Sequence, residues 1–420
     1  MERKLYPLLP MQRWLIDTHF EKAKSTMMNI GALFKLDPSI DTKRFADAIN
    51  DMLKYHDIFR CRLTVDPQSG DIRQHFDGKI SPVIFMQMNE EQLELHLKYL
   101  RMPFDLMEAP LYRIYVIETE DGNYFFADFY HAMFDGLTTG FLFLRELDMR
   151  YRGREFKRPA ESFAEYILER QKISPSELDR QGQYWTQMFD GFDPEKHLPP
   201  ADIEGAEELA QNTVEHTLEN IDQTFFKGKS ISANTFFIAA TMLTVAKSAG
   251  QSDAKISWVH NGRMSMREQR LFALTIEQYP IAWDFKRDQT VDDFLSGVDE
   301  KINEGFQYRE GLAAAYEEGL EDYCVSFILQ KATSAHVGFT AKVGDAKMIA
   351  VELPPNDMSA VENALDVELD INDDDSYNLI LDYDASRYSV RAMENFAASF
   401  DEISLAMQDG ARMVSTIINA

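Results

Sequence analysis

Apolar and polar residues alternate along the chain with two periodicities, one typical of amphipathic helices and one typical of β-strands. Residues 41–53 follow the first, because apolar side chains recur there at helical spacing and Asp41 can cap the start. Residues 111–119 and 123–130 follow the second, and the Asp-Gly pair between them predicts a hairpin. Similar patterns predict helices at 11–23, 89–100, 137–152, 234–249, 291–305 and from 389, and strands at 28–36, 58–76 (a hairpin), 80–88, 255–260, 279–285, 323–330 and 377–384. The mixture indicates an α+β protein in which helices pack on sheets.

One stretch interrupts this pattern. Residues 191–212 combine prolines and glycines with an acidic, polar run that has little apolar periodicity. The mixed pattern continues on both sides, and a chain of 420 residues has the length of two or three domains. We therefore expect an N-terminal lobe at 1–190, a connector at 191–212 and a C-terminal lobe at 213–420.

The composition excludes several classes of protein. The chain has 43 Lys+Arg against 70 Asp+Glu, and its net charge of −27 argues against a nucleic-acid partner. Two cysteines, Cys61 and Cys324, are too few for a disulfide-built fold or a zinc site, so we expect free thiols. There is no signal-peptide core near the N-terminus and no apolar stretch of about 18 residues. These features predict a soluble, cytoplasmic protein without a membrane span.

The loop at residues 131–136, HAMFDG, carries the clearest candidate chemistry. It lies between a predicted strand and a predicted helix, where a scaffold commonly presents catalytic side chains. A neutral His131 can take a proton from an attacking amine or hydroxyl, and Asp135 can cap the next helix or bind an arginine. Gly136 permits a backbone conformation or a close approach that a Cβ would forbid. The spacing of His, Asp and Gly occurs in many proteins and does not by itself establish catalysis.

A series of segments along the whole chain resembles condensation domains of nonribosomal peptide synthetases. That family belongs to the HxxxDG acyltransferase superfamily, which includes chloramphenicol acetyltransferase. The matching segments, in chain order, are YPLLPMQRWLID (6–17), KYHDIFRCRL (54–63), PFDLMEAPLYR (103–113), YHAMFDG (130–136), QYWTQMFDGF (183–192), LPPAD (198–202), NGR (261–263), LFALTIEQYPIAWDF (271–285), VSFILQ (325–330) and LDYDASRYSV (381–390).

The resemblance implies two chloramphenicol-acetyltransferase-like lobes in a V-shaped pseudo-dimer, with a tunnel between them that reaches His131 from both faces. A carrier-protein phosphopantetheine thioester, or CoA, would donate the acyl group to an amine, and no metal or bound cofactor would be needed. His131 would act as base or positioning group together with Gly136, and Asp135 would form a structural pair with Arg60. The protein would act as a monomer with an acyl or peptidyl carrier protein as its partner.

The chain departs from the family pattern at several positions. Tyr130 replaces the first of two adjacent histidines, which favours ester formation from an alcohol as an alternative to amide formation. Glu277 and Gln278 replace Asn-Thr, and Ala282 replaces an arginine, in the segment that resembles the donor side of the tunnel. We take Tyr130, Glu277, Gln278 and Gln330 as candidates for the tunnel wall or donor side. Leu137-Thr138-Thr139 does not match epimerisation domains, and a non-catalytic recruitment domain remains a further alternative.

A basic cluster stands out in this acidic chain. It consists of Arg150, Arg152, Arg154, Lys157 and Arg158. These residues either follow a helix C-terminus, where cations suit the helix dipole, or form a docking site for phosphopantetheine, CoA or an acidic carrier helix.

The remaining candidates have ordinary structural explanations. The spacing of acidic and amide residues at Asp370, Asn372 and Asp374 resembles the start of a calcium-binding loop. The positions where such a loop has its glycine and its last glutamate are occupied by Asp375 and Leu381. We expect a solvated acidic turn there. His260 is expected to be structural, and Met133, Phe134 and Phe141 are expected in the core or the tunnel wall.

Overall fold

The computed structural model describes residues 3–21, 25–190, 193–204, 211–229, 231–317, 325–331, 337–354, 363–372 and 374–419. The chain forms two compact units. The first comprises Met1–Lys172, Asn261–Ile276 and Ala332–Met358, and the second comprises Ile173–His260, Glu277–Lys331 and Ser359–Ala420. The first stretch of the first unit therefore stops at Lys172, before the predicted connector at 191–212. Two later stretches of the chain then join the first unit again. Local periodicity could not predict these returns, because they depend on contacts between segments far apart in the sequence.

The first unit contains a mixed six-stranded sheet with strand order β11-β12-β1-β6-β5-β4. Its strands are β1 (Asn29–Leu36), β4 (Ile84–Gln87), β5 (Tyr112–Glu118), β6 (Asn123–Tyr130), β11 (Thr340–Val343) and β12 (Ala346–Val351), and β2 (Arg62–Val65) pairs with β3 (Ile72–His75) beside it. Its helices are α1 (Pro10–Glu21), α2 (Thr42–Tyr55), α3 (Glu90–Leu100), α4 (Phe143–Tyr151) and α5 (Phe163–Arg170), with 3₁₀ turns η1 (Asp57–Arg60) and η5 (Glu268–Arg270) and a π-helical turn, η2 (Thr138–Leu142).

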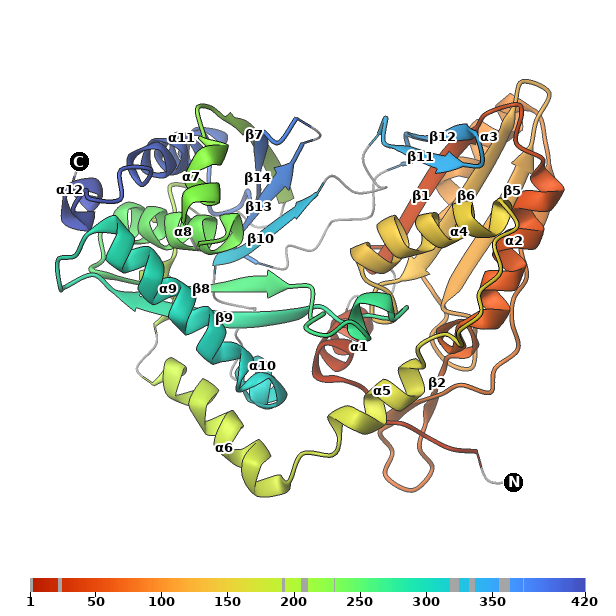
Figure 1. The fold of residues 1–420 in the computed structure, drawn as a ribbon, viewed down its shortest axis with the longest axis horizontal. Helices are drawn as coiled ribbons and strands as arrows, with labels where there is room; N and C mark the ends of the chain where they lie inside the picture. Colours follow the sequence, from red (N-terminus) through yellow and green to blue (C-terminus); the bar gives the residue numbers. More distant parts are fainter. Residues whose placement is uncertain are drawn as a thin grey trace. The chain divides into compact units, whose positions relative to one another are not determined.

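Helices cover both faces of this sheet (Figure 1). α2 and α4 are in contact on one face, where Phe45 of α2 and Phe143 of α4 both pack against Phe125 of β6. α3 packs on the other face through Leu93 and Leu100. Successive residues of a strand point to opposite faces, so the two packing layers explain why β6 is buried at every position after Asn123.

The second unit contains another mixed six-stranded sheet, with strand order β7-β14-β13-β10-β8-β9. Its strands are β7 (Gln211–Leu218), β8 (Asp253–His260), β9 (Glu277–Asp284), β10 (Val325–Lys331), β13 (Leu365–Ile371) and β14 (Tyr377–Asp384). Its helices are α6 (Pro175–Thr186), α7 (Gln223–Gly228), α8 (Ala233–Ala249), α9 (Val291–Phe306), α10 (Leu312–Glu317), α11 (Val390–Ala406) and α12 (Val414–Ile418), with 3₁₀ turns η3 (Gln187–Phe189), η4 (Pro194–His197) and η6 (Arg309–Gly311).

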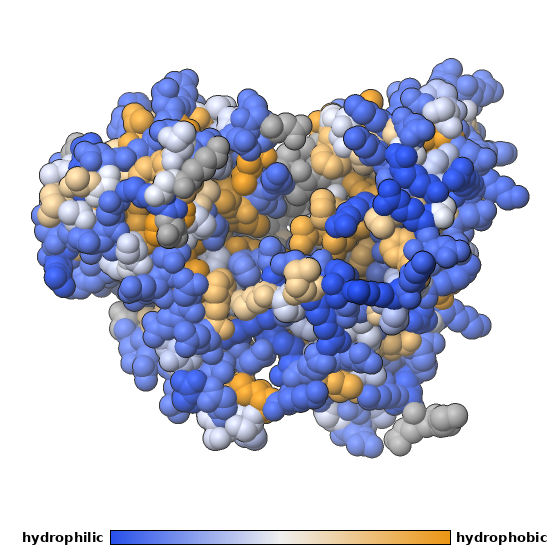
Figure 2. Space-filling model, viewed as in Figure 1, coloured by the Kyte–Doolittle hydropathy of each residue, from blue (hydrophilic) through white to orange (hydrophobic). Residues whose placement is uncertain are grey.

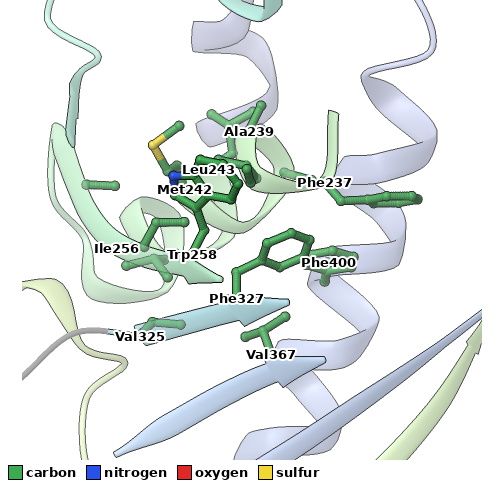
Figure 3. Packing of buried hydrophobic residues seen from close by; sticks show 14 of the residues in the cluster. Phe237, Ala239, Met242, Leu243, Ile256, Trp258, Val325, Phe327, Val367 and Phe400 are labelled. Carbon is green, nitrogen blue, oxygen red and sulfur yellow. The ribbon is translucent and has the colours of Figure 1, made fainter. Parts of the chain in front are cut away.

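The core of the second unit lies between its sheet and helices α8 and α11. Phe237 of α8 and Phe400 of α11 are stacked, and Trp258 and Phe327 from the sheet are buried in the same cluster (Figure 3). The middle of α8 is buried on every side, which agrees with its lack of a polar face. Figure 2 shows mainly hydrophilic residues over the visible outer surface of both units.

The predicted α+β class is confirmed, and every helix and strand predicted from the pattern has a counterpart in the structure. Cys61 is buried, and burial raises the pKa of its thiol. The prediction of a free thiol therefore holds for Cys61, whereas Cys324 lies outside the described residues. Within the described ranges, no helix is both long enough and apolar enough to cross a bilayer.

Candidate active site around the HxxxDG loop

The loop at residues 131–136 connects the end of β6 to the π-helical turn η2. The backbone N–H of His131 donates to Met28 O over 2.8 Å, and the N–H of Phe134 donates to Tyr130 O over 3.2 Å. The side chains of Ala132, Met133 and Phe134 are buried, whereas His131 is half-buried. The tight turn therefore points three apolar side chains inward and leaves the imidazole accessible.

The imidazole of His131 is oriented by its own loop. Its Nδ1 lies 3.1 Å from the carbonyl oxygen of Phe134. A carbonyl oxygen only accepts hydrogen bonds, so Nδ1 carries the proton in this contact and Nε2 keeps its lone pair. Nε2 has no hydrogen-bond partner among the described residues, which leaves it available to accept a proton.

Asp135 is fully buried, and its carboxylate holds several distant groups together. Its Oδ1 accepts from the backbone N–H of Thr138 over 2.7 Å, and its Oδ2 accepts from the N–H and hydroxyl of Thr275, each over 3.0 Å. Arg263 Nη2 lies 3.0 and 2.9 Å from the two carboxylate oxygens. Asp135 therefore fixes the start of η2 to a segment more than a hundred residues away.

The predicted pair between Asp135 and Arg60 is wrong. Arg60 lies at the end of η1, and its guanidinium donates to Lys54 O over 2.9 Å. The partner of Asp135 is Arg263, whose side chain is only 1% exposed. Short-range sequence patterns gave no way to choose between these arginines, because the actual pair joins positions 128 residues apart.

The segment Asn261–Ile276 runs along the loop and is part of the first unit. The N–H of Leu274 donates to Met133 O over 2.6 Å, and the hydroxyl of Thr138 donates to Ala273 O over 2.9 Å. Arg263 Nη1 donates to the carbonyls of Glu268 and Leu271, over 2.6 and 2.7 Å. One arginine thus shapes this segment and also binds Asp135.

Gln12 is a site residue that the sequence reasoning missed. Its side chain is fully buried, and Nε2 donates to Ala132 O over 3.1 Å, beside His131. Its Oε1 accepts from Gln74 Nε2 over 2.9 Å and from Leu9 N over 3.0 Å. A signal was available, because Gln12 lies among Met11, Leu15 and Ile16 on the buried face of α1, where a polar residue needs a partner.

Gly136 is not required by the backbone conformation. Its φ is outside the left-handed region, and a Cβ added there would meet no heavy atom of the described residues within 4 Å. The expectation that the backbone conformation requires glycine at position 136 is therefore wrong, whereas a close approach of a bound group to Gly136 stays a prediction. The position is open on the side where a side chain would project.

Tyr130, at the end of β6, is buried in the core of the first unit. Its ring lies edge-on to His19 and Phe104, with centroid distances of 5.5 and 5.8 Å. Burial raises the pKa of its hydroxyl. Tyr130 is fully covered in the described structure and therefore packs as a core residue.

The other three tunnel candidates lie in the second unit and make contacts of their own there. Both oxygens of Glu277 lie 2.7 Å from Arg309 Nε, and Glu277 also accepts from Tyr279. Gln278 is buried, and its amide donates to the hydroxyl of Ser257 over 2.7 Å. The amide of Gln330 donates to Glu368 on the neighbouring strand β13.

The basic cluster divides into two groups. Arg150 donates to Glu146 over 2.7 Å, and Arg152 forms ion pairs with Asp148 and Asp345 at 3.0 and 3.1 Å. These two arginines are therefore used within the fold. The other three, Arg154, Lys157 and Arg158, have exposed side chains without ion-pair partners among the described residues.

The remaining candidates mostly behave as expected. Phe134 is buried, whereas Phe141 is 53% exposed and is therefore not a core residue; its place in a tunnel wall stays a prediction. His260 packs against Phe306, at a centroid distance of 4.9 Å.

The acidic segment 370–374 divides between a strand and a turn. Asp374 accepts from Ser376 in the β13–β14 turn, as expected for a solvated acidic turn, whereas Asp370 is buried on β13. Within the described residues, no cluster of His, Cys, Asp and Glu has the arrangement of a metal site.

Comparison with known proteins identifies the family. The model of the Condensation domain family matches residues 2–417. The chain belongs to the condensation-domain family. This condensation domain is 23% identical over 316 residues to Tyrocidine synthase 3 of Brevibacillus parabrevis and 26% identical over 313 residues to Surfactin synthase subunit 2 of Bacillus subtilis (strain 168). The matches cover 73% and 72% of the chain but only 5% and 8% of these relatives.

Solved structures share the fold of this condensation domain. The condensation domain from Monacolin K polyketide synthase aligns with a TM-score of 0.78 at 18% identity, and the alignment covers 98% of this chain and 99% of that one. The epimerization domain from the third module of tyrocidine synthetase B aligns with a TM-score of 0.75 at 16% identity, covering 100% and 99%. At these identities the likeness extends to the fold, and the chemistry has to be argued from the site.

Proposed function

We propose that this condensation domain transfers an acyl group from a carrier-borne phosphopantetheine thioester to an amine, with His131 as the general base. The observation that carries the proposal is the contact between His131 Nδ1 and Phe134 O, which leaves the Nε2 lone pair available. The match to the Condensation domain family, together with the resemblance to condensation domains of nonribosomal peptide synthetases, supports a carrier-bound donor and an amine acceptor.

The reaction needs one proton acceptor and a fixed geometry. The amine nitrogen attacks the thioester carbonyl carbon, a C–N bond forms and the C–S bond breaks. His131 Nε2 takes the proton from the nitrogen and returns it to the departing thiolate. The thioester is already activated, so orientation supplies much of the rate, and the Asp135–Arg263 pair serves to hold the loop.

Carrier docking is assigned to the exposed group Arg154, Lys157 and Arg158. These three cations can bind the phosphate of phosphopantetheine or an acidic carrier surface, because no ion pair among the described residues occupies them. Arg150 and Arg152 are left out of the docking site because Glu146, Asp148 and Asp345 neutralise them.

Mass spectrometry of the products tests this function. Carrier-bound and CoA-bound acyl thioesters are incubated with mixed amine and alcohol acceptors, using wild type and His131→Ala side by side. We expect an amide from the carrier-bound donor, and its loss in His131→Ala. An ester as the main product would favour the O-acyltransferase alternative, and product that survives the substitution would contradict the role of His131. Carrier binding without turnover by the wild type would favour a recruitment domain.

A further inference from the structure

One helix of the first unit carries apolar side chains on two opposite sides. On one side of α3, Leu93 and Leu100 pack against the sheet. On the other side, Leu95, Tyr99 and Met102 are exposed, Leu95 by 58%. These three residues are spaced by four and three positions, so they lie in one row along the helix and its C-terminal end. We call this row the α3 stripe; exposed apolar surface of this kind is typical of interaction sites.

The edge of the sheet on this side of the unit is open as well. β4 is the last strand in the order of the sheet, and among the described strands it pairs with β5 alone. Met86 of β4 packs against the cluster that contains Leu93 and Leu100. Ile84 lies two positions earlier on the strand, so it points to the same face, and it is exposed. Exposed apolar side chains are therefore present both on α3 and on the α3-facing side of the edge strand.

The charges of α3 are divided between its two halves. Glu91 and Glu94 lie in the N-terminal half, and Lys98 lies in the last turn. All three side chains are exposed, and none of them forms an ion pair with another described residue. This order of charges suits the helix dipole, but the dipole does not account for the exposed apolar residues between and beyond them.

The division of charge makes α3 complementary to an antiparallel copy of itself. Glu91 lies four residues before Leu95 and Lys98 lies three residues after it, so both charges flank the same side of the helix as the α3 stripe. If two copies pack antiparallel and cross near Leu95, Glu91 of one copy lies close to Lys98 of the partner subunit. A two-fold axis forms this pair twice. A parallel arrangement would instead place Glu91 beside its own copy, which is repulsive.

We infer that α3 is the interface of a homodimer, in which the α3 stripe of one copy packs antiparallel on the α3 stripe of a second copy. The apolar row supplies the buried contact, and the two Glu91–Lys98 pairs set the orientation. This inference takes the place of the monomer expected from the family resemblance. It does not depend on the proposed function, because α3 contains none of the residues placed in the site.

The size of the contact and the net charge determine how strong the dimer is. A pair of short helices forms an interface below the standard size, so we expect a weak dimer with a dissociation constant of about 10 µM. The net charge of −27 opposes association of two copies. At about 0.15 M salt, however, repulsion is screened beyond about 8 Å, so the charges at the contact itself have the larger effect.

Sedimentation equilibrium from about 1 to about 300 µM protein measures the dissociation constant, and we expect wild type to pass from monomer to dimer over this range. Leu95→Glu brings two like charges to the two-fold axis and should raise the dissociation constant at least about tenfold. Leu405→Glu is the matched control, because Leu405 is a 50% exposed leucine on α11 of the second unit. Wild type that stays monomeric at about 300 µM, or a dimer that Leu95→Glu weakens no more than Leu405→Glu does, would overturn the inference.

Charge reversals test the antiparallel orientation. Glu91→Lys and Lys98→Glu each turn both ion pairs of the homodimer into like-charge contacts, and each should raise the dissociation constant about tenfold. The double variant Glu91→Lys/Lys98→Glu restores opposite charges and should return to within about threefold of wild type. The two single variants, when mixed, should form a heterodimer, because both of its pairs are attractive. Reversals without effect, or a loss that neither the double variant nor the mixture restores, would overturn the inference.

Discussion

Each unit contains a strand that runs into a helix through a short loop, and the two junctions are built differently. In the first unit, β6 leads through residues 131–136 to η2 and α4; in the second, β14 leads through residues 385–389 to α11. Asp135 of the first junction binds Arg263 from a distant segment, whereas Asp384 of the second binds its neighbour Ser386 through N–H and hydroxyl, over 2.9 and 2.5 Å.

The second junction is closed by contacts within its own helix and to residues 199–202 of the same unit. Ser389 caps α11 by accepting from the N–H of Ala392 over 3.1 Å, and the buried Tyr388 donates to Pro199 O over 3.1 Å. The first junction leaves an imidazole nitrogen without a partner among the described residues, and an open side at Gly136. This contrast is the basis for proposing that the first junction serves chemistry and the second serves packing.

The largest effect is expected at His131. His131→Ala should lower kcat by roughly 10²–10⁴-fold, the usual contribution of a general base. The melting temperature should stay near that of wild type, because the side chain is only half-buried. Tyr388→Phe, at the second junction, is the control and should keep wild-type kcat. A kcat for His131→Ala within threefold of wild type would remove the functional contrast between the junctions.

The buried ion pair gives the next largest effect. Arg263→Met leaves the Asp135 carboxylate buried without its charged partner and should lower the free energy of unfolding of the first unit by about 3–5 kcal/mol. Arg60→Met removes only a hydrogen bond to Lys54 O and should cost under about 1 kcal/mol. Urea denaturation of both variants measures the difference. Equal losses would contradict the assignment of Arg263 as the anchor of the loop.

Glu368, on β13 next to β14, contrasts with Asp135, because its hydrogen-bond partner is the side-chain amide of Gln330 and not an arginine. Burial raises the pKa of Glu368 to about 7, helped by Asp370 and Asp382, while the hydrogen bond from Gln330 opposes the shift. The folded state therefore binds this proton more tightly than the unfolded state, whose pKa is near 4.5. The resulting stabilisation is complete below about pH 4.5 and is lost as pH rises through about 7.

Replacing the carboxyl of Glu368 by an amide tests the direction of its pKa shift. Glu368→Gln should raise the free energy of unfolding at pH 8 by roughly 2–3 kcal/mol and should match wild type near pH 4.5. Denaturation curves at several pH values measure the gap between the two proteins. A gap that does not change with pH would contradict the raised pKa.

The smallest effect is expected at the basic residues that follow the C-terminus of α4. Reversing the charges of Arg154, Lys157 and Arg158 to glutamate should raise KM for a carrier-borne donor about tenfold, and added salt should reduce the difference. Lys342→Glu with Lys347→Glu is the control, since both lysines are exposed on β11 and β12. Equal effects of the two charge reversals would indicate general electrostatics and no docking site.

Elements with strong local signals were predictable from the sequence. Apolar periodicity and the Asp41 cap located α2, and Asp121-Gly122 located the β5–β6 hairpin. The pairing of β12 with β1 was not predictable, because its residues lie more than 300 positions apart and neither strand encodes its partner. The HxxxDG loop was found from its motif, but its anchor Arg263 and its support Gln12 come from other parts of the chain. Long-range pairs of this kind depend on the folded topology.

The protonation of the His131 ring tests the central claim most directly. Long-range ¹H–¹⁵N NMR spectra of protein labelled at histidine, recorded at pH 8, distinguish a protonated Nδ1 from a protonated Nε2, and His131→Ala assigns the signal. The hydrogen bond to Phe134 O predicts a protonated Nδ1 and a free Nε2 lone pair. A ring protonated at Nε2 would contradict the account, because that nitrogen could not then accept the proton of the attacking amine.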